Sequence, residues 1–367
     1  MTAIPLVDLQ LQHRQIEDEV REGFDRVLSQ GSFILGPEVE EFEQAFAAFS
    51  GASHCVGVAS GTDALELALR AAGVGQDDEV LVPVNTFIAT ALSVARVGAR
   101  PVFVDCDPAH WLIDTGAAEA AITPRTRAIV PVHLYGQMAP MAALAPIAQQ
   151  NGLALVEDAA QAQGARQNGG DVCANSVAAA TSFYPGKNLG AYGDAGAVLT
   201  SNEEIASDLR RLRNYGSDVK YHHPVQGFNS RLDTLQAVVL LAKLRHLDRW
   251  NQQRRDAAAR YESLLQDIGD VRRPSTAEGN EHVWHLYVVR VPRRDHTLAA
   301  LHEAGIGAGI HYPTPLHLAG AFEHLGYQRG DFPRAEEAAD EILSLPLFPG
   351  IEAEQQERVV AELQQNL

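Results

Sequence analysis

Short apolar segments alternate with helical patterns through the first two-thirds of the chain, and this alternation limits the possible fold more than any other feature. The apolar segments span residues 55–59, 79–83, 101–105, 128–132 and 153–158, and helical patterns cover residues 62–72, 88–97 and 141–150. Strands separated by helices form βαβ units, in which a mostly parallel sheet carries helices on both faces. The sequence therefore predicts the α/β class.

The last third of the chain has a different pattern. One long helix is predicted over residues 232–261, after which the composition shifts towards Arg, Glu and His. The segment Trp284–Val289 indicates a strand pair. At 367 residues the chain is long enough for two domains. We therefore expect a large domain with an N-terminal arm over residues 1–250 and a smaller α+β domain over residues 251–367.

Charge and cysteine content exclude several classes of function. The formal net charge is −18 at pH 7, which argues against nucleic-acid binding because such binding depends on a basic surface. The three cysteines, Cys55, Cys106 and Cys173, form no CxxC pair. They indicate a reducing compartment, with neither a disulfide framework nor a metal centre.

Membrane insertion and secretion are not expected either. The start of the chain lacks an apolar stretch of signal-peptide length, and no run approaches the ~18 apolar residues that span a bilayer. We expect a cytoplasmic protein with no membrane partner.

Polar side chains gather at the predicted strand ends. These residues are Ser60, Asn85, Asp105, His133 and Asp158. Ligands of open α/β sheets bind at the carboxyl ends of the strands, so we expect the functional site there.

Lysine is rare in this chain, which has only Lys187, Lys220 and Lys243 among its 29 Lys and Arg residues. Lys187 lies in the largely uncharged segment SFYPGKNLGA. A lysine amine can form an imine with a carbonyl once its pKa is lowered, whereas arginine cannot be deprotonated in proteins. The alternative interpretation of Lys187 is an ordinary surface lysine. Lys243 stands between leucines in a predicted helix, where we expect a surface residue or one whose buried stem carries the amine to the solvent.

The segment Ser60-Gly61-Thr62 joins a predicted strand to a predicted helix. The free N–H groups of a helix start and the two hydroxyls suit a phosphate, and glycine permits close approach. Ser182, five residues before Lys187, adds a further hydroxyl. A plain helix N-cap is the alternative interpretation.

Asp158 ends an apolar strand and is either a structural cap or the partner of a buried cation. If a pyridoxal ring lies above the sheet, its ring nitrogen must stay protonated, and a buried carboxylate keeps it so. Gln161 lies one helical turn further on, within reach of the ring's phenolic oxygen. Phe87 is able to stack on a flat ring, although most phenylalanines belong to the core. A phosphate cup, an aromatic residue, a carboxylate and a lysine are together the parts of a pyridoxal 5′-phosphate (PLP) enzyme.

The order of the motifs SGTDAL, NTFIAT, PVHLYG, VEDAAQAQGA, SFYPGKNLGAYGDAGAV and GFNSRLDTLQA resembles the DegT/DnrJ/EryC1/StrS family of sugar aminotransferases. The resemblance extends from about Val7 to Gly350. It implies the fold-type I architecture of PLP enzymes and a homodimer whose active sites lie at the subunit interface.

The resemblance also assigns roles to individual residues. Lys187 would be the Schiff-base lysine and general base, Asp158 the partner of the pyridinium nitrogen, and Gln161 the contact of the ring oxygen. Gly61, Thr62 and Ser182, with Ser60 beside them, would hold the phosphate, Phe87 would lie against the ring, and Asn229 would reach the phosphate of the other subunit's cofactor. Gln163 departs from the family, whose members more often have histidine here, and this change is expected on the substrate side of the pocket.

Lys187 favours transamination, because family members that act as dehydratases have histidine at this position. The resemblance implies L-glutamate as amino donor, a pyridoxamine phosphate form of the cofactor and a nucleotide-linked keto-sugar as acceptor. The segment Ile310–Leu318 resembles that of members acting on dTDP-linked 3-keto-6-deoxyhexoses at C3. The substrate-side candidates are Tyr184, Lys220, Tyr221, His311 and Tyr312. A solvated loop around Lys220 and a structural His-Tyr-Pro turn are the alternatives.

Other functions fit the sequence less well. A C4 keto-sugar or a ketocyclitol is the alternative acceptor. A nicotinamide dehydrogenase would carry GxGxxG after the first strand, where this chain has ASGTDA. A non-catalytic regulator with the same fold would be expected to lose Lys187 or Asp158, and both are present.

Overall fold

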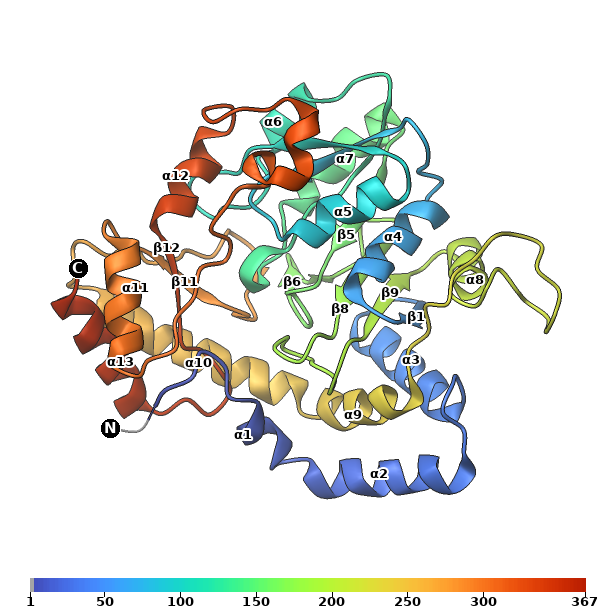
Figure 1. Ribbon diagram of the computed structural model, residues 1–367, viewed down its shortest axis with the longest axis horizontal. Helices are drawn as coiled ribbons and strands as arrows, with labels where there is room; N and C mark the ends of the chain where they lie inside the picture. Colours follow the sequence, from blue (N-terminus) through green and yellow to red (C-terminus); the bar gives the residue numbers. More distant parts are fainter. Residues whose placement is uncertain (1–2) are drawn as a thin grey trace.

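The computed structural model describes residues 3–367 and has a seven-stranded sheet at its centre (Figure 1). The strands lie in the order β1-β9-β8-β5-β4-β2-β3. Their bounds are β1 His54–Val58, β2 Glu79–Pro83, β3 Arg100–Val104, β4 Thr126–Ile129, β5 Ala154–Asp158, β8 Ala178–Ser182 and β9 Gly196–Thr200. β9 is antiparallel to both of its neighbours, and the other strands run parallel to one another. The predicted α/β class with a mostly parallel sheet is confirmed.

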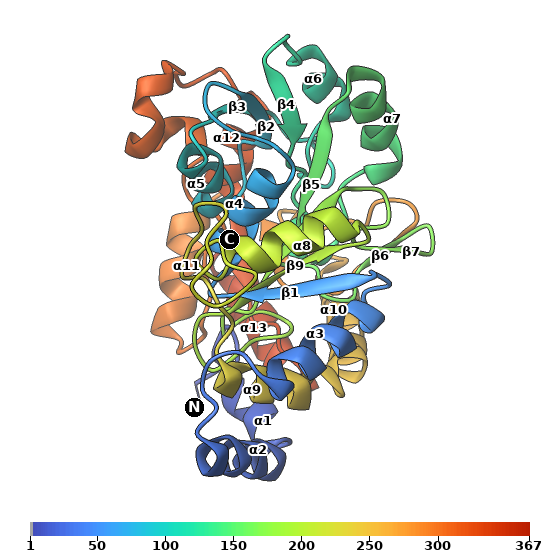
Figure 2. The same ribbon diagram turned by 90° about the vertical axis from the view of Figure 1, so that its right-hand side faces the viewer.

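Helices cover both faces of the sheet. One layer contains α4 Gly61–Ala71, α5 Ile88–Arg96 and α8 Glu203–Leu212, and the other contains α3 Pro37–Phe49, α7 Met141–Asn151 and α9 Thr234–Leu244. Within β1, Val56 and Val58 pack into the first layer and Cys55 into the second, because successive side chains of a strand point to opposite faces. Figure 2 shows α8 and α4 above β1 and α3 below it.

Strands β8 and β9 escaped the sequence analysis. β8 reads AAATS, and alanine is a weak strand former. Its small side chains are fully buried between the two helical layers, so burial decides the conformation here. This strand matters for function because it ends at Ser182 and leads into the segment that carries Lys187.

The prediction of one helix over residues 232–261 is wrong. α9 ends at Leu244, and α10 runs from Leu247 to Leu265 after a turn in which the His246 N–H donates to the Lys243 carbonyl (3.0 Å). α9 packs against α3 and α2 Glu17–Gln30, whereas α10 packs against α13 Ala353–Gln365. Because the two helices pack against different parts of the protein, the chain changes direction between them.

The expectation of Lys243 at the surface is wrong as well. Only 2% of this residue is exposed, and its Nζ lies 5.0 Å from the centre of the Tyr192 ring. The aliphatic part of the side chain is buried, and the amine lies against the face of the Tyr192 ring.

The C-terminal part has its own apolar core around an antiparallel pair of strands, β11 Tyr287–Arg290 and β12 Ile342–Leu345. The strand expected at 284–289 thus starts at Tyr287. Around this pair lie α10, α11 Arg294–Glu303, α12 Pro333–Glu341 and α13 (Figure 1). The N-terminal arm joins this part through the Ile4 N–H, which donates to the Gly305 carbonyl (2.9 Å). The division into residues 1–250 and 251–367 stays a prediction.

The remaining elements are short. They are α1 Leu9–His13, α6 Thr115–Ala120, the small sheet of β10 Asn280–Glu281, β6 Arg166–Gln167 and β7 Gly170–Asp171, and the 3-10 helices η1 Leu134–Gly136, η2 Leu316–Leu318 and η3 Gly320–Leu325. Within residues 3–367, no helix combines the length and the apolar character needed to cross a membrane.

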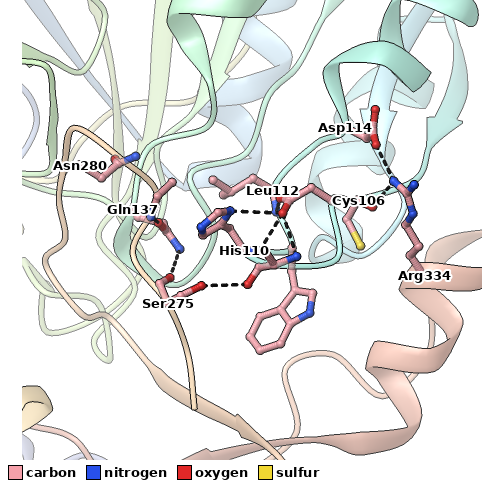
Figure 3. Close-up of polar contacts among 12 residues, drawn as sticks. Cys106, His110, Leu112, Asp114, Gln137, Ser275, Asn280 and Arg334 are labelled. Atoms are coloured by element: carbon pink, nitrogen blue, oxygen red, sulfur yellow. Dashed lines mark hydrogen bonds and ion pairs between the residues drawn. The ribbon is translucent and has the colours of Figure 1, made fainter. Parts of the chain in front are cut away.

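Polar contacts tie the C-terminal part to loops at the carboxyl edge of the sheet (Figure 3). The Gln137 side-chain amide donates to the Ser275 carbonyl (3.2 Å), and the Ser275 hydroxyl donates to the Ala109 carbonyl (3.1 Å). Arg334 of α12 pairs with Asp114 at 2.5 Å. The strand-end loops are therefore held between the two parts of the molecule.

Candidate active site

Lys187 lies in the segment that connects β8 to β9. The segment is closed by its own backbone: the Lys187 N–H donates to the Tyr184 carbonyl (2.8 Å), and the Ala191 N–H donates to the Phe183 carbonyl (2.7 Å). A Cβ atom on Gly190 would lie 2.2 Å from the Pro185 carbonyl oxygen, so only glycine fits there. This tight path fixes the position from which the lysine side chain projects.

Burial lowers the pKa of Lys187 to about 8, and the charge of Asp158 opposes this shift. Desolvation disfavours the ammonium form, whereas a nearby carboxylate favours it. An amine with this pKa is neutral in a far larger fraction of molecules near physiological pH than an ordinary lysine is, and the neutral form is the one that acts as a nucleophile or a proton acceptor.

Asp158 ends β5 and is 5% exposed. The Thr90 hydroxyl donates to its Oδ2 (2.7 Å), and the Ala160 N–H donates to its Oδ1 (3.2 Å). Burial raises the pKa of Asp158, and these hydrogen bonds and the Lys187 charge oppose the shift. A carboxylate so placed is suited to a buried cationic N–H, which would favour its ionised form.

Thr90 was missed in the sequence analysis although it belongs to the motif NTFIAT. It lies on α5 three residues after Phe87, and its hydroxyl also contacts the hydroxyl of Thr86 (3.0 Å). Its place in the same motif as Phe87 was the available signal.

Gln161 lies beside the same site and is buried. Its side-chain oxygen accepts a hydrogen bond from the Tyr135 backbone N–H (2.6 Å), and its amide nitrogen donates to the Tyr312 hydroxyl (3.0 Å). The ring of Phe87, which is 51% exposed, lies 5.2 Å from that of Tyr312. The structure thus brings the predicted residues Gln161, Phe87 and Tyr312 together.

His311 precedes Tyr312 and is partly buried. Its Nδ1 lies 2.8 Å from the Ser344 hydroxyl, and its carbonyl accepts from the Tyr135 hydroxyl. Burial and the charge of Lys187 lower the pKa of His311 to about 4. The imidazole is therefore neutral at physiological pH and adds no charge to the site.

The predicted phosphate cup lies where α4 begins, and its role in phosphate binding stays a prediction. Ser60 caps this helix by accepting from the Asp63 N–H (3.1 Å). A Cβ on Gly61 would lie 2.5 Å from the Ser182 Cβ, so the helix start and the end of β8 touch at this glycine. With Thr62 in the first turn, free N–H groups and hydroxyls converge on one point, an arrangement suited to an anion.

Gln163 lies beneath this cup. Its amide donates to the Thr181 hydroxyl (2.8 Å) and to the Ser182 carbonyl (3.0 Å), and its own backbone carbonyl accepts from Asn251 (2.9 Å). These contacts support β8 from below. They give Gln163 partners at the end of β8, and the expected effect of this residue on the substrate side of the pocket stays a prediction.

Asn188, the residue after Lys187, was also missed. Its amide nitrogen donates to Asn251 of α10 (2.9 Å) and to the Val283 carbonyl (3.0 Å), and its oxygen lies 3.2 Å from His285 Nδ1. A buried amide with three partners holds the lysine segment against the C-terminal part. No sequence signal pointed to it, because its partners are distant in the chain.

His133 and Glu157 form a second buried pair next to Asp158, with 2.5 Å between His133 Nε2 and Glu157 Oε2. The other Glu157 oxygen accepts from the Cys173 N–H (3.0 Å) and the Ser176 hydroxyl. His133 is thus engaged in a structural pair at the strand end.

Four predicted residues lie on the exposed surface of this chain: Tyr184, Lys220, Tyr221 and Asn229. Lys220 and Tyr221 belong to the long loop beyond α8 (Figure 1), where the Lys220 amine lies 5.1 Å from the Tyr221 ring centre. Their assigned roles stay predictions.

The family model described as the DegT/DnrJ/EryC1/StrS aminotransferase family matches residues 14–364. The chain belongs to this family. The resemblance carried by the sequence motifs is confirmed, and with it the assignment of the protein as an aminotransferase.

Two relatives illustrate the similarity. The dTDP-3-amino-3,4,6-trideoxy-alpha-D-glucose transaminase of Streptomyces venezuelae is 49% identical over 357 residues, which cover 97% of this chain and 94% of the relative. A protein of Geobacillus stearothermophilus named pleiotropic regulatory protein is 50% identical over 362 residues, with 98% and 97% covered.

Solved structures agree closely with this fold. The crystal structure of S. venezuelae DesV in complex with a ketimine intermediate is 48% identical with a TM-score of 0.97, and the match covers 100% of this chain and 98% of that one. The crystal structure of Bacillus subtilis NtdA with bound cofactor PMP is 33% identical with a TM-score of 0.89, covering 96% and 82%.

The aminotransferase uses PLP, and the residues present fit this cofactor. When bound, PLP supplies an electron-withdrawing ring that stabilises negative charge on the carbon beside the amine. Asp158 would hold the protonated ring nitrogen, Gln161 the ring oxygen, and the N-terminus of α4 with Ser182 the phosphate. Lys187 would supply the amine that tethers the aldehyde.

Proposed function

We propose that this aminotransferase moves an amino group from L-glutamate to C3 of a dTDP-linked 3-keto-6-deoxyhexose. The observation that carries the proposal is the presence of Lys187 and the buried Asp158 at the ends of the neighbouring strands β8 and β5 in a chain 49% identical to a transaminase named for a dTDP-linked 3-amino sugar. The lowered pKa of Lys187 supports proton transfer at this position.

In this reaction the residues of the chain have separate tasks. Lys187 Nζ, neutral above about pH 8, accepts the proton from the α-carbon of the amino donor and gives a proton to the sugar carbon that receives the nitrogen. Asp158 balances positive charge beneath the reacting atoms, and Thr90 orients that carboxylate. Phe87, which is half exposed, and Tyr312 lie against each other beside Gln161.

A regulator without catalytic activity is the second candidate, because a relative 50% identical to this chain is named a regulatory protein. The name of that relative is the sole support for a regulatory function. The electrostatic interaction between Lys187 and Asp158 favours catalysis.

A panel of 3-keto and 4-keto nucleotide sugars and ketocyclitols, each incubated with PLP-loaded enzyme and L-glutamate, tests the proposal. Mass spectrometry should detect the amino product with the dTDP-linked 3-keto-6-deoxyhexose at the highest rate. Preference for a 4-keto sugar or a ketocyclitol would contradict the proposed acceptor, and no turnover of any member would favour the regulator.

The proposal includes a homodimer with shared active sites and a cytoplasmic location. The Asn229 side chain is exposed and, within residues 3–367, makes no hydrogen bond of its own, so it is free to reach a partner's cofactor phosphate. The three free cysteines, all buried, are consistent with a reducing compartment.

Mixed dimers test the shared site. Lys187→Ala and Asn229→Ala subunits, each inactive alone, should regain part of the activity when hybrids form, because one site in each hybrid then combines an intact lysine with an intact partner asparagine. Demonstrated hybrids without activity would contradict this geometry.

A further inference from the structure

His285 is a buried histidine to which the family resemblance assigns no role. Only 8% of the residue is exposed, and its Nδ1 lies 3.2 Å from the side-chain oxygen of Asn188, the residue that follows Lys187. The pKa of His285 is lowered well below its ordinary value, first by burial and then by the charge of Lys187. The imidazole is therefore neutral at physiological pH and carries a single N–H hydrogen.

The contacts of Asn188 decide which ring nitrogen of His285 carries that hydrogen. The Val283 carbonyl, 3.0 Å from one end of the Asn188 amide, only accepts hydrogen bonds. The end that faces it must be the NH₂ group, so the oxygen of Asn188 faces His285. The second NH₂ hydrogen goes to the Asn251 side-chain oxygen (2.9 Å), and the Asn251 amide itself donates to the Gln163 carbonyl (2.9 Å). Two backbone carbonyls therefore fix the orientation of both amides.

The orientation of Asn188 in turn fixes the tautomer of His285. The Asn188 oxygen only accepts, so the hydrogen of the imidazole must lie on Nδ1, and Nε2 is left as an acceptor. Within residues 3–367 no donor reaches His285 Nε2, and this atom is not among the polar atoms that are fully enclosed without a partner. The protein therefore leaves one acceptor of the ring available.

The amine of Lys187 is a donor close to this acceptor, and it likewise makes no hydrogen bond within the described part of the chain. Its charge contributes to the pKa shifts of His285 and His311, and the charge of Asp158 contributes to its own. The Nδ1 of His311 contacts the Ser344 hydroxyl (2.8 Å), which either donates or accepts, so no contact fixes the tautomer of that ring. His285 is the imidazole whose free nitrogen is defined by its contacts.

We propose that Lys187, once its amine is free of the cofactor, donates one N–H to His285 Nε2, and that Asn188 is the positioning residue that keeps this nitrogen an acceptor. This rests on the role proposed above for Lys187. With one N–H held by the imidazole, the neutral amine keeps its lone pair in a restricted direction, as proton transfer to and from carbon requires. After Lys187 has accepted a proton, the same bond stabilises the ammonium form.

The tautomer of His285 is measurable without turnover. In PLP-loaded enzyme labelled with ¹⁵N in histidine, long-range ¹⁵N–¹H spectra should show the His285 hydrogen on Nδ1, with the signal assigned by its loss in His285→Gln. Asn188→Ala should abolish this preference, because the acceptor that fixes it is gone. A wild-type His285 with its hydrogen on Nε2 would overturn the inference, and this measurement does not depend on the folding of any variant.

Two substitutions of His285 separate the bond to Lys187 from the bond to Asn188. In His285→Gln an amide oxygen replaces Nε2 as acceptor, whereas in His285→Asn an amide NH₂ replaces the Nδ1–H donor and nothing replaces Nε2. Conversion of the PLP form by L-glutamate should be slower in His285→Asn than in His285→Gln by about 3- to 10-fold, the value of one hydrogen bond. A residue that only supports Asn188 would give the reverse order, and that order or equal rates would overturn the inference.

His282→Asn is the matched control. His282 is buried in the same segment, and its Nδ1 accepts from the Trp284 N–H (2.9 Å), a bond that the asparagine oxygen can replace. Lys187 is not among the causes of its pKa shift. This variant should keep the wild-type rate, and urea denaturation of all three variants shows whether a slow rate reflects loss of folded protein.

The pH profile gives a readout that a structural role would not move. An acceptor of an ammonium N–H favours the charged form and raises the pKa of the amine. At saturating L-glutamate, the rising limb of the rate in His285→Asn should therefore move to lower pH by about 0.5 to 1 pH unit, and an unmoved limb would overturn the inference. A wild-type rate in Lys187→Ala would overturn the proposed role of Lys187 as well, whereas a slow Lys187→Ala beside an unchanged His285→Asn would overturn this inference alone.

Discussion

Burial lowers the pKa of both Lys187 and Lys243 to about 8, although Lys187 is partly exposed and Lys243 is only 2% exposed. Their surroundings differ. Lys187 interacts with the charge of Asp158, whereas Lys243 lies against the ring of Tyr192 and burial is the one cause of its shift. A lowered amine pKa therefore does not identify a catalytic lysine. The carboxylate and the phosphate cup around Lys187 distinguish it.

The two lysines are also connected in space. Tyr192 belongs to the same β8–β9 segment as Lys187. Its backbone N–H donates to the Gln236 side-chain oxygen of α9 (2.8 Å), and its hydroxyl lies 2.6 Å from His13 Nδ1. Lys243 supports this segment from α9. We therefore expect Lys187 to take part in the chemistry and Lys243 to support the segment that presents it.

The largest expected difference is in turnover. Lys187→Ala should reduce the rate of conversion by L-glutamate by about 10²- to 10⁴-fold or more, because the proton acceptor is lost, whereas Lys243→Met should stay within a few-fold of the wild type. Absorbance measures the rate. Borohydride reduction followed by peptide mass spectrometry should place the cofactor on Lys187 alone, and a label on Lys243 would contradict the comparison.

Asp158→Asn should lower the same rate by about 10- to 10³-fold, corresponding to the one to three pKa units by which an adjacent opposite charge shifts a buried group. Among the described residues, no carboxylate contributes to the pKa shift of Lys243. The conversion rate of Asp158→Asn, measured across pH, should be lower than that of the wild type at every pH at which the wild type is active. An unchanged rate would mean that the ring nitrogen does not depend on this carboxylate.

Thr90→Val tests the support of Asp158 with a nearly isosteric change. Removing the hydroxyl that donates to Oδ2 (2.7 Å) should slow conversion by about 3- to 10-fold, the value of one hydrogen bond. Thr297→Val, in α11, removes a hydroxyl of similar burial that donates to the Asn366 carbonyl (2.9 Å), and this control should keep the wild-type rate.

The smallest expected effect is on stability and comes from Lys243. Its folded pKa, about 8, lies below the ordinary 10.5, so between these values the unfolded chain binds more protons and stability rises with pH. Below about pH 8 the burial of the charged amine costs stability. Lys243→Met should therefore raise the free energy of unfolding at pH 7 by about 1–3 kcal/mol and flatten the pH dependence between about 8 and 10.5. Urea denaturation at a series of pH values measures both.

Local patterns were sufficient to find the candidate residues of the cofactor site. Asp158 follows an apolar run and Ser60-Gly61-Thr62 joins a strand to a helix, so the order of residues along the chain is enough to place both at strand ends. The alanine-rich β8 and the turn at Arg245 and His246 were not predicted, because burial between layers and a change of packing partner decide them.

The sequence by itself determined the class of the fold, the family and the candidate residues of the cofactor site, since these follow from motifs that are contiguous in the chain. The tertiary structure alone decided which groups support them. Thr90 meets Asp158, Asn188 meets Asn251, and Tyr135 meets both Gln161 and His311. Hydrogen bonds and desolvation depend on distances in space, and no local pattern records which distant residues the packed sheet and helices bring together.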